Sequence, residues 1–457
     1  MAWRHMERRE FLALVGGAAS VELARRIGLQ TTPETSKADV TMRISPVEME
    51  VAPRKWIKTT GYNGTAPGPV LRMREGQRVS VNVINETKIP ELLHWHGLFI
   101  PPEVDGSEEE GTPLVPPGRS WQYSFVPRPA GTRWYHSHIH AGRDMKRATY
   151  TGQFGVLYIE PKDEPGRYDS EIFLALHGWE PYLTAQGEEG SLEVAYPVYS
   201  INSHALGSGD PVRVKEGDKV LFRIVNASAT AQHRIALSGH KFEVLSLDGN
   251  TVPASREVDT IEMGPGERVD AVVAMNQPGV WILGEADDQV RNSGLGIVVE
   301  YANRSGAPQW TAPSKAPWDY TIFGREAAET PEPAGGVVPL VFRKKFAGHN
   351  WVDNWTINGK SFPKTDPIRV RANSRYRLRF DNQSNEAHPV HMHRHSFELT
   401  KFAGKATSGV MKDVVVVPAM KQVEVDFTAD NPGRTLFHCH QQLHMDYGFM
   451  TMVEYEG

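Results

Sequence analysis

Residues 79–83 read Val-Ser-Val-Asn-Val, a strict alternation of apolar and polar side chains. Because successive side chains of a β-strand point to opposite faces, this alternation predicts a half-buried strand. The strand belongs to a longer pattern of a proline, an alternating strand, a polar turn and a second alternating strand that ends in asparagine. The pattern occurs at residues 69–85, 211–226 and 367–382. Repeated short strands of this kind predict an all-β protein of three tandem β-sandwich domains.

A second repeated segment puts the three copies in register. In each copy a proline-led turn leads through alternating strands to a glycine, namely Gly131, Gly279 and Gly433. Five residues after that glycine the first and third copies carry His-x-His, whereas the middle copy carries Gly284-Glu285-Ala286. The paired histidines therefore occupy equivalent places in the first and third domains only.

Composition and spacing predict where the domains begin and end. The expected domains lie at residues 39–162, 163–304 and 339–457, with a proline-containing linker at 305–338. Residues 1–38 are expected to be an export signal or a disordered segment, because Arg8 and Arg9 precede Glu10-Phe11-Leu12 and a short apolar stretch. This start is similar to a twin-arginine signal, which implies a periplasmic or secreted protein.

Charge and hydropathy narrow the range of partners. The 457 residues carry 50 basic and 55 acidic side chains, for a formal net charge of -5. This balance gives no electrostatic reason to expect nucleic acid as a partner. No apolar run approaches the roughly 18 residues that span a bilayer, so no membrane span is expected. The single cysteine, Cys439, cannot form an internal disulfide, and it lies between two histidines.

Histidines gather in four short clusters. Ten of the 18 histidines fall in these clusters: His94, His96, His136, His138, His388, His391, His393, His438, His440 and His444. Residues i and i+2 of a strand share a face, so each His-x-His presents two imidazoles on one side. Four such pairs offer more nitrogen ligands than one mononuclear site uses. Because imidazole suits copper and no carboxylate cluster accompanies the histidines, we expect a polynuclear copper centre.

Cys439 connects this centre to a second one. Strand alternation turns Cys439 to the face opposite His438 and His440. A thiolate with two histidines, here His388 and His444, is the ligand set of a blue-copper electron-transfer site. Electrons that arrive at Cys439 then have a covalent path to the histidine cluster.

The four clusters stand in the order found in the three-domain multicopper oxidases, and after residue 38 the chain resembles this laccase-like family. The resemblance implies cupredoxin-like Greek-key domains, four coppers per chain, and a trinuclear cluster between the first and third domains. The implied ligands are His388, Cys439 and His444 for type 1 copper; His94 and His391 for type 2; and His96, His136, His138, His393, His438 and His440 for the two type 3 coppers. The implied reaction couples one-electron oxidation of phenols or aromatic amines to four-electron reduction of dioxygen to water.

Two positions near these clusters leave alternatives open. Asp105 matches the family's acidic residue that supplies protons to reduced oxygen, but it also fits an Asp-Gly turn. A second relay carboxylate, placed in bacterial relatives directly after the last type 1 histidine, is Met445 here. The axial position of the type 1 site falls on Phe449, although a slip of one residue would bring Met450 there. Because a weak thioether stabilises oxidised copper, its absence should raise the potential and favour phenols as substrates.

Other functions remain as rivals. A cuprous or ferrous ion oxidase is suggested by five methionines in the final domain: Met411, Met420, Met445, Met450 and Met452. Their scattered, core-like spacing favours core filling instead. A copper-carrying or scaffold protein without turnover would be expected to lack ligands, and none is missing. His233 and His395 are expected to be structural, while His140 extends the second cluster.

Overall fold

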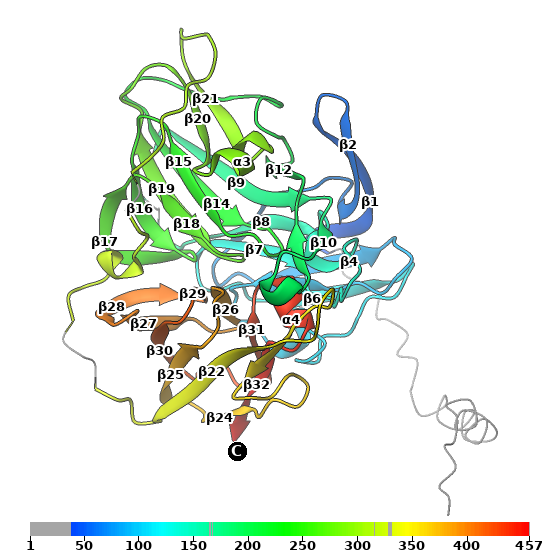
Figure 1. The fold of residues 1–457 in the computed structure, drawn as a ribbon. Coiled ribbons are helices and arrows are strands. Elements are labelled where there is room, and N and C mark those ends of the chain that lie inside the picture. Colours follow the sequence, from blue (N-terminus) through cyan, green and yellow to red (C-terminus); the bar gives the residue numbers. More distant parts are fainter. Residues whose placement is uncertain (1–37, 164–165, 167, 315, 328–330, 457) are drawn as a thin grey trace, which may run out of the picture. The chain divides into compact units, whose positions relative to one another are not determined.

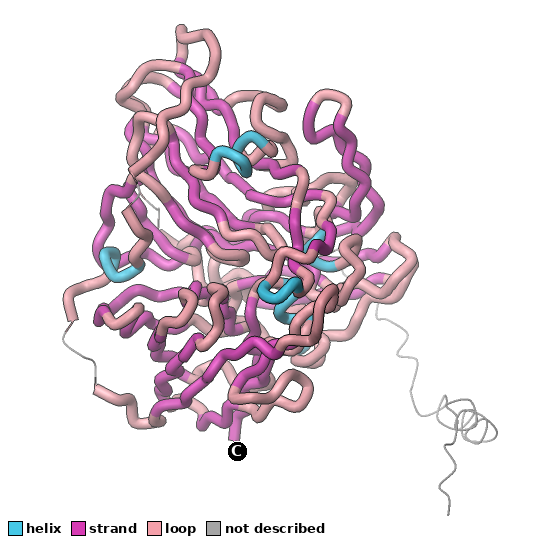
Figure 2. The backbone as a smooth tube through the Cα atoms, viewed as in Figure 1, coloured by secondary structure: helices cyan, strands magenta, loops and turns pink. Residues whose placement is uncertain are grey.

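The structure is a computed structural model that describes residues 38–163, 166, 168–314, 316–327 and 331–456. The expected twin-arginine segment lies outside the described residues. Across the described ranges strands predominate, and the two α-helices, α3 (Asp288–Asn292) and α4 (Gln442–Asp446), are short, as the magenta and cyan segments in Figure 2 show. None of the described helices is long and apolar enough to cross a membrane. The predicted all-β class is confirmed.

Two four-stranded sheets make up the first domain (Figure 1). One sheet has the order β2-β1-β4-β6, with β1 (Val40–Ala52), β2 (Lys55–Tyr62), β4 (Val79–Asn85) and β6 (Ser120–Phe125). The other has the order β3-β8-β7-β5, with β3 (Leu71–Arg74), β5 (Leu93–His96), β7 (Gly131–Ser137) and β8 (Phe154–Glu160). Along β4 the valines Val81 and Val83 are fully buried and the residues beside them are less so. The alternation read from the sequence therefore marks one face of the sandwich core.

The second domain has larger sheets and an added hairpin. Its six-stranded sheet has the order β12-β9-β14-β19-β16-β17, formed by β9 (Ser170–Trp179), β12 (Val198–Ile201), β14 (Lys219–Asn226), β16 (Phe242–Leu247), β17 (Asn250–Val258) and β19 (Arg268–Ala274). Its five-stranded sheet has the order β13-β21-β20-β15-β18, formed by β13 (Val212–Val214), β15 (His233–Leu237), β18 (Ile261–Met263), β20 (Val280–Glu285) and β21 (Gly296–Tyr301). The hairpin joins β10 (Tyr182–Thr184) and β11 (Glu193–Ala195).

The third domain repeats the six-plus-five arrangement. One sheet has the order β23-β22-β25-β30-β27-β28, formed by β22 (Val337–Lys345), β23 (Asn354–Ile357), β25 (Arg375–Asn382), β27 (Phe397–Phe402), β28 (Lys405–Lys412) and β30 (Gln422–Thr428). The other has the order β24-β32-β31-β26-β29, formed by β24 (Ile368–Arg371), β26 (His388–Met392), β29 (Val414–Val417), β31 (Thr435–Cys439) and β32 (Met450–Glu456).

One topology underlies all three domains. In each domain the two parallel strand pairs fall at corresponding places: β1 with β4 and β3 with β8; β9 with β14 and β13 with β21; β22 with β25 and β24 with β32. The remaining pairs within these sheets are antiparallel. This repetition confirms the three tandem sandwiches, while the residue boundaries predicted for them stay a prediction.

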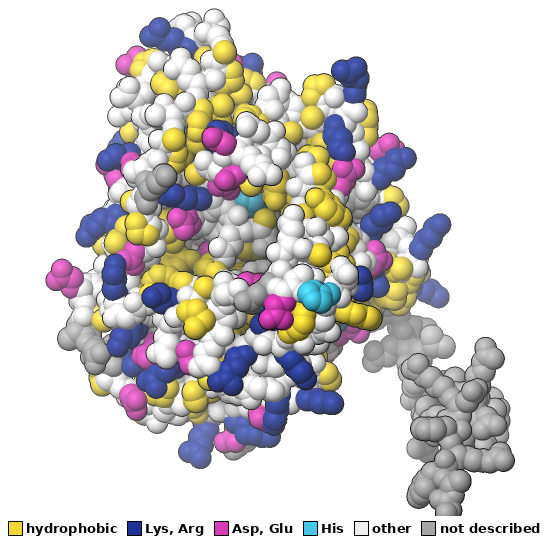
Figure 3. Space-filling model, in the orientation of Figure 1, with side chains coloured by type: hydrophobic (Ala, Val, Ile, Leu, Met, Phe, Trp, Pro, Cys, Tyr) yellow, Lys and Arg dark blue, Asp and Glu magenta, His cyan; other side chains and the backbone are white. Residues whose placement is uncertain are grey.

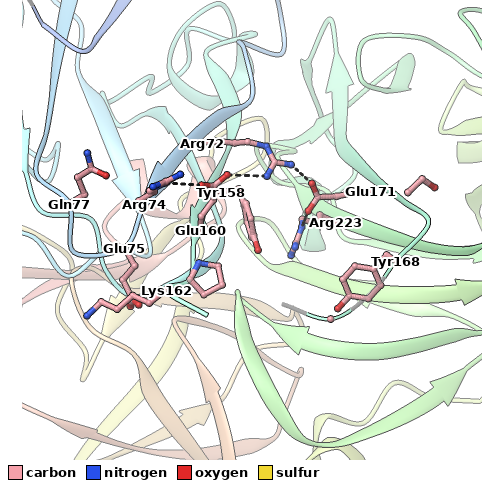
Figure 4. A pocket seen from close by; sticks show the side chains of 13 residues that line it. Arg72, Arg74, Glu75, Gln77, Tyr158, Glu160, Lys162, Tyr168, Glu171 and Arg223 are labelled. Carbon is pink, nitrogen blue, oxygen red and sulfur yellow. Dashed lines mark hydrogen bonds and ion pairs between the residues drawn. The ribbon is translucent and has the colours of Figure 1, made fainter. Parts of the chain in front are cut away.

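Ion pairs join the first and second domains. Arg72 of β3 lies 3.5 Å from Glu160 of β8 and also pairs with Glu171 of β9 (Figure 4). Arg223 of β14 approaches the same Glu171 at 2.5 Å. Tyr158 lies between the two guanidinium groups, at 5.2 Å from that of Arg72 and 4.0 Å from that of Arg223. The two guanidinium groups and the two carboxylates pair with one another, so the surface pocket that these residues line joins the first and second domains.

Candidate metal centre

Four strands carry the paired histidines of the first and third domains. In the first domain β5 and β7 place His94 opposite His136, and in the third domain β26 and β31 place His391 opposite His438. These pairs meet the other domain directly, because Nε2 of His138 lies 3.4 Å from Nε2 of His438. All eight histidines of the four pairs are at most 5% exposed. The structure therefore gathers the predicted cluster into one buried site between the two domains.

Two imidazoles of this cluster have an unused nitrogen. Nδ1 of His94 donates to the carbonyl of Asp105 at 2.9 Å, and Nδ1 of His391 donates to the carbonyl of Asp413 at 2.8 Å. The Nε2 atom of each ring is buried and has no hydrogen-bond partner among the described residues. In a neutral imidazole that nitrogen carries a lone pair and can bind a metal ion. Burial lowers the pKa of both rings well below the usual range, which keeps them neutral.

A second group of three presents lone pairs to one another. Nδ1 of His438 donates to the carbonyl of Cys439 at 2.9 Å, and Nδ1 of His393 donates to Asp105 Oδ2 at 2.8 Å. Their Nε2 atoms nevertheless lie only 3.1 Å apart, with Nε2 of His138 at 3.4 Å from that of His438. In their neutral forms these two nitrogens are both acceptors and do not form a hydrogen bond. Although burial opposes it, Glu110 and Asp105 raise the pKa of His393 to about 9, so a cation that binds here must displace a proton from that ring. Nitrogens bound to one tetrahedral metal ion at about 2.0 Å lie about 3.3 Å apart, so the group fits a shared cation.

The third group uses a different ring nitrogen. His96 donates through Nε2 to Asp413 Oδ1 at 3.1 Å, which leaves Nδ1 as the lone pair. That Nδ1 lies 3.4 Å from Nε2 of His136 and 3.3 Å from Nε2 of His440. Burial lowers the pKa of His440 to about 3. Three neutral imidazoles thus converge here as well, which is the donor set that copper prefers.

Cys439 lies with His388 and His444 on the opposite face of β31. Its Sγ is 3.9 Å from Nδ1 of His388 and 3.6 Å from Nδ1 of His444, and those two nitrogens are 3.2 Å apart. Nε2 of His388 donates to Ser384 Oγ at 2.8 Å, so its Nδ1 is the lone pair. All three are buried, and burial raises the pKa of the Cys439 thiol well above its usual range. A bound cation would be needed to favour the thiolate.

Phe449 is the residue above this second site. Its ring centroid lies 4.9 Å from that of His388, and its backbone N–H donates to the carbonyl of His444 at 3.0 Å. Met450 points the other way, into a separate apolar cluster with Leu436, Met445 and Met452. The strand register therefore favours Phe449 over Met450 at the axial position.

Besides Asp413, two carboxyl groups lie against the histidine cluster, so the expectation that no carboxylate cluster accompanies the histidines was wrong. Asp105 Oδ2 is 3.0 Å from Nδ1 of His94 and 2.8 Å from Nδ1 of His393, so Asp105 does more than begin a turn. Glu110 was not singled out from the sequence, yet its Oε2 lies 3.5 Å from Nδ1 of His393. Burial, with Asp105 nearby, raises the pKa of Glu110 to about 7. The only sequence feature that could have pointed to Glu110 is the run of three glutamates that it ends, and such a run is usually a solvated surface segment.

The histidines outside the two sites have other partners. Nε2 of His395 is 2.8 Å from the hydroxyl of Tyr455, and Nε2 of His240 is 2.6 Å from that of Tyr301, as expected for structural residues at equivalent places. His140 is 45% exposed and lies between Glu109 and Asp446. Of the five methionines, Met445, Met450 and Met452 fill core, as expected, whereas Met420 is 66% exposed and the expectation of core filling was wrong for it.

Comparisons with known proteins agree with this geometry. Three family models described as multicopper oxidase match residues 44–164, 189–298 and 339–456. A curated relative, multicopper oxidase MmcO of Mycobacterium tuberculosis, is 30% identical over 438 residues, covering 87% of this chain and 83% of that protein. Laccase-2 of Trametes villosa is 27% identical over 452 residues, covering 85% and 84%. A solved multi-copper oxidase from Pseudomonas thermotolerans has a TM-score of 0.72 at 24% identity, covering 92% of this chain and 100% of that one.

Proposed function

The chain belongs to the multicopper oxidase family and is a copper-dependent oxidoreductase, and from this premise we propose that it oxidises phenols and aromatic amines with dioxygen. Four reductant molecules would each lose one electron, and one dioxygen would take up four electrons and four protons to give two waters. Copper at the sites described above would supply the electron transfer and the dioxygen chemistry. The alternative reductants are cuprous or ferrous ions.

Each copper is assigned to one of the four groups of side chains whose ligand atoms converge. Type 1 copper would be held by His388, Cys439 and His444. Type 2 copper would be held by the two unpartnered Nε2 atoms, those of His94 and His391. The two type 3 coppers would be held by His96, His136 and His440 and by His138, His393 and His438. The observation that supports this assignment is the 3.1–3.4 Å approach of imidazole nitrogens to one another. In four of these rings the other nitrogen already donates, namely in His96, His136, His393 and His438.

A carboxylate beside His444 supports an organic reductant. Glu386 Oε2 lies 3.3 Å from Nε2 of His444, and Lys344 approaches the other oxygen at 2.7 Å. Although burial opposes ionisation, the hydrogen bonds from His444 and Lys344 hold the pKa of Glu386 at about 2. The ionised carboxylate can accept a hydrogen bond from a phenolic O–H or an aromatic N–H and so orient the reductant beside His444.

A cleft between the second and third domains offers room for an aromatic ring. It has a volume of about 500 Å³ and includes Ala387, the residue before His388. The remaining wall combines apolar and acidic side chains, among them Met263, Trp318, Phe402, Val416, Pro418, Glu262 and Asp287. Figure 3 shows apolar and acidic side chains around a hollow on this face. The apolar side chains of this wall suit an aromatic ring, and its carboxylates can pair with a protonated amine.

Asp105 is proposed as the proton source for dioxygen reduction. Its contacts with His94 and His393 place a carboxyl group at the histidine cluster. Met445 occupies the second relay position and is buried among methionines, so a carboxylate must act from elsewhere. Asp105→Asn should slow dioxygen consumption more than it slows reduction of the blue copper by the substrate.

Dioxygen uptake tests the reaction directly. The fully copper-loaded chain is given a phenol, an aromatic amine or cuprous ion, and dioxygen consumption is recorded for each. We expect the organic reductants to be consumed faster, at four molecules per dioxygen. Faster uptake with cuprous ion would identify a metal oxidase, and full copper binding without uptake would identify a carrier or scaffold.

We also propose export through the twin-arginine pathway to the periplasm or outside the cell. The support is the sequence Arg8-Arg9-Glu10-Phe11-Leu12 alone. Replacing both arginines with lysine should retain the protein in the cytoplasm, as measured by cell fractionation. Unchanged export would show that these residues are not such a signal.

A further inference from the structure

We propose that Arg268, in the second domain, positions the copper ligand His96 by holding Asp413 in place. Arg268 contacts no histidine of the cluster through any described hydrogen bond and was not singled out from the sequence. The proposal rests on the proposed role of His96 as a ligand. The second domain supplies none of the proposed copper ligands, and this proposal gives it a role in positioning one of them.

Asp413 selects the nitrogen that each of two ligands presents. Its Oδ1 accepts from Nε2 of His96 at 3.1 Å, and its backbone carbonyl accepts from Nδ1 of His391 at 2.8 Å. His96 must therefore present Nδ1 and His391 must present Nε2. The two rings stack with centroids 3.8 Å apart and planes 11° apart. One residue thus sets the tautomer of a ligand in the first domain and of another in the third.

Arg268 holds the Asp413 carboxylate with two parallel hydrogen bonds. Nη1 lies 2.6 Å from Oδ1, and Nη2 lies 2.6 Å from Oδ2. The guanidinium is itself fixed, because it donates to the carbonyls of Gly266, Asp248 and Thr132 at 3.0, 3.1 and 3.3 Å. A paired fork of this kind defines both the position and the plane of the carboxylate.

A second contact from the same domain holds the Asp413 backbone. Asp248 Oδ2 accepts from the N–H of Asp413 at 3.2 Å and from that of Val414 at 3.1 Å. The turn that carries Asp248 packs tightly against the first domain, since a Cβ atom on Gly131 would overlap the carbonyl of Gly249. The second domain therefore meets both ligand-bearing domains at the point where His96 is oriented.

Burial makes this arrangement sensitive to Arg268. Arg268, Asp413 and His96 are all 0% exposed, so water does not replace a lost contact. The remaining cation, Arg133, reaches Asp413 Oδ2 only at 3.4 Å. Without Arg268 the carboxylate is left largely uncompensated and has no fixed plane. Loss of such a partner of a metal-bound histidine typically costs 10–100-fold in metal affinity.

The test compares Arg268→Lys with the matched control Arg223→Lys. Arg223 is also a buried arginine of the second domain, 2.7 Å from Asp270, and it has no described contact with Asp413. Copper per chain, the blue band and the electron paramagnetic resonance signal of non-blue copper are measured after equal copper loading. We expect Arg268→Lys to keep the blue band and to bind copper outside the blue site 10–100-fold more weakly. Arg223→Lys should bind as the wild type does.

Asp413→Asn provides a second variant that keeps an acceptor for His96. The amide oxygen can still accept from Nε2 of His96, but the amide NH2 group faces Nη2 of Arg268 and the guanidinium loses its counter-charge, so this variant should also bind less non-blue copper than the wild type. Melting of the copper-free variants monitors the fold. Unchanged non-blue copper in Arg268→Lys would overturn the proposal, as would an equal loss of blue and non-blue copper together with a lowered melting temperature. If the wild type itself lacked non-blue copper, the proposed function would be wrong instead.

Discussion

The second and third domains build the same frame around one buried histidine and then complete it differently. In the second domain Asn226 accepts from the N–H of Ser228 at 3.0 Å, and Ser228 Oγ lies 2.9 Å from Nε2 of His233. The third domain repeats this with Asn382, Ser384 and His388, at 3.0 and 2.8 Å. The asparagines are the ones that end the repeated strand pattern in the sequence. The frame is thus a feature of the repeat and does not depend on a metal site.

What differs is the pair of residues that faces the histidine. Strand register places Glu285 opposite Ile235 and Cys439 opposite Val390, so Glu285 and Cys439 are equivalent. Five residues later stand Val290 and His444, in the short helices α3 and α4. In the second domain Glu285 Oε2 accepts a hydrogen bond from Nδ1 of His233 at 3.1 Å. In the third domain the corresponding Nδ1 of His388 keeps its lone pair available for a metal. The residues at these two positions therefore decide whether the buried histidine is held by a second hydrogen bond or is left available as a metal ligand.

The first domain shows a third solution. Register puts Leu93 opposite Ser137, which makes Ser137 the equivalent of Cys439 and Glu91 the equivalent of His388. Glu91 is 1% exposed and Ser137 is 0% exposed. A buried carboxyl group therefore stands where the third domain has an imidazole.

The largest effect is expected where the third domain departs from the other two. Cys439→Ser, which places the first domain's residue at this position, should abolish the blue band and the oxidase activity, because a hydroxyl does not replace the thiolate. The histidine cluster should still bind copper. Absorption and copper content are measured on the same sample, and a variant that stays blue would contradict the ligand assignment.

Breaking the closed core of the second domain should cost stability and leave the copper sites intact. Glu285 accepts from Nδ1 of His233 and from the backbone N–H groups of Arg234 and Ala286 at 2.9–3.1 Å. Glu285→Gln turns an acceptor into a donor there, which should lower the free energy of unfolding by about 4 kcal/mol. Urea denaturation measures the loss, and Glu216→Gln, in an exposed turn of the same domain, should change the free energy of unfolding by less than about 0.5 kcal/mol. A loss of blue colour in Glu285→Gln would contradict the expectation that this core is independent of the copper sites.

The first domain should make stability depend on pH. Burial raises the pKa of Glu91 from 4.5 to about 7, although Gln153 and Arg147 act in the other direction. Because the pKa of Glu91 is higher in the folded state than in the unfolded state, the folded state binds a proton more tightly. The resulting stabilisation is complete below about pH 4.5 and is lost as the pH rises through 7. The expected loss is about 3 kcal/mol.

Glu91→Gln isolates this dependence, since the amide stays neutral. The difference in unfolding free energy between variant and wild type should grow in favour of the variant from pH 4.5 to 7. The exposed Glu48→Gln serves as the control. A difference that does not change with pH would mean that Glu91 is not the buried titrating group.

The smallest effect is expected at the residue above the blue site. Phe449→Met adds a weak thioether ligand, which should lower the type 1 potential and slow phenol oxidation several-fold, less than the tenfold that about 1.4 kcal/mol of barrier produces. Met450→Leu should do little, because that side chain faces the other way. Redox titration of the blue band in both variants measures the shift, and a potential that follows Met450 alone would reverse the register.

Much of this architecture is local and was therefore readable from the sequence. Alternation along each strand marks its buried face, so the three sandwiches and their register followed from the asparagine-ending repeat. The same alternation separated Cys439 from His438 and His440, since neighbouring strand residues cannot share a face. It also placed Phe449 and Met450, at the start of β32, in different apolar clusters.

Tertiary structure decided what no local pattern encodes. Asp413 and Glu110 touch ligands that lie far away in sequence, such as His96, which is 317 residues from Asp413. Arg268 and Asp248 act from a domain whose own strands carry no ligand pair. Side-chain periodicity reports which face a residue occupies within its sheet, whereas these contacts depend on how the faces of three sheets meet. The proposed ligands are therefore encoded in local sequence motifs, whereas the groups that orient them are brought there by the packing of the domains.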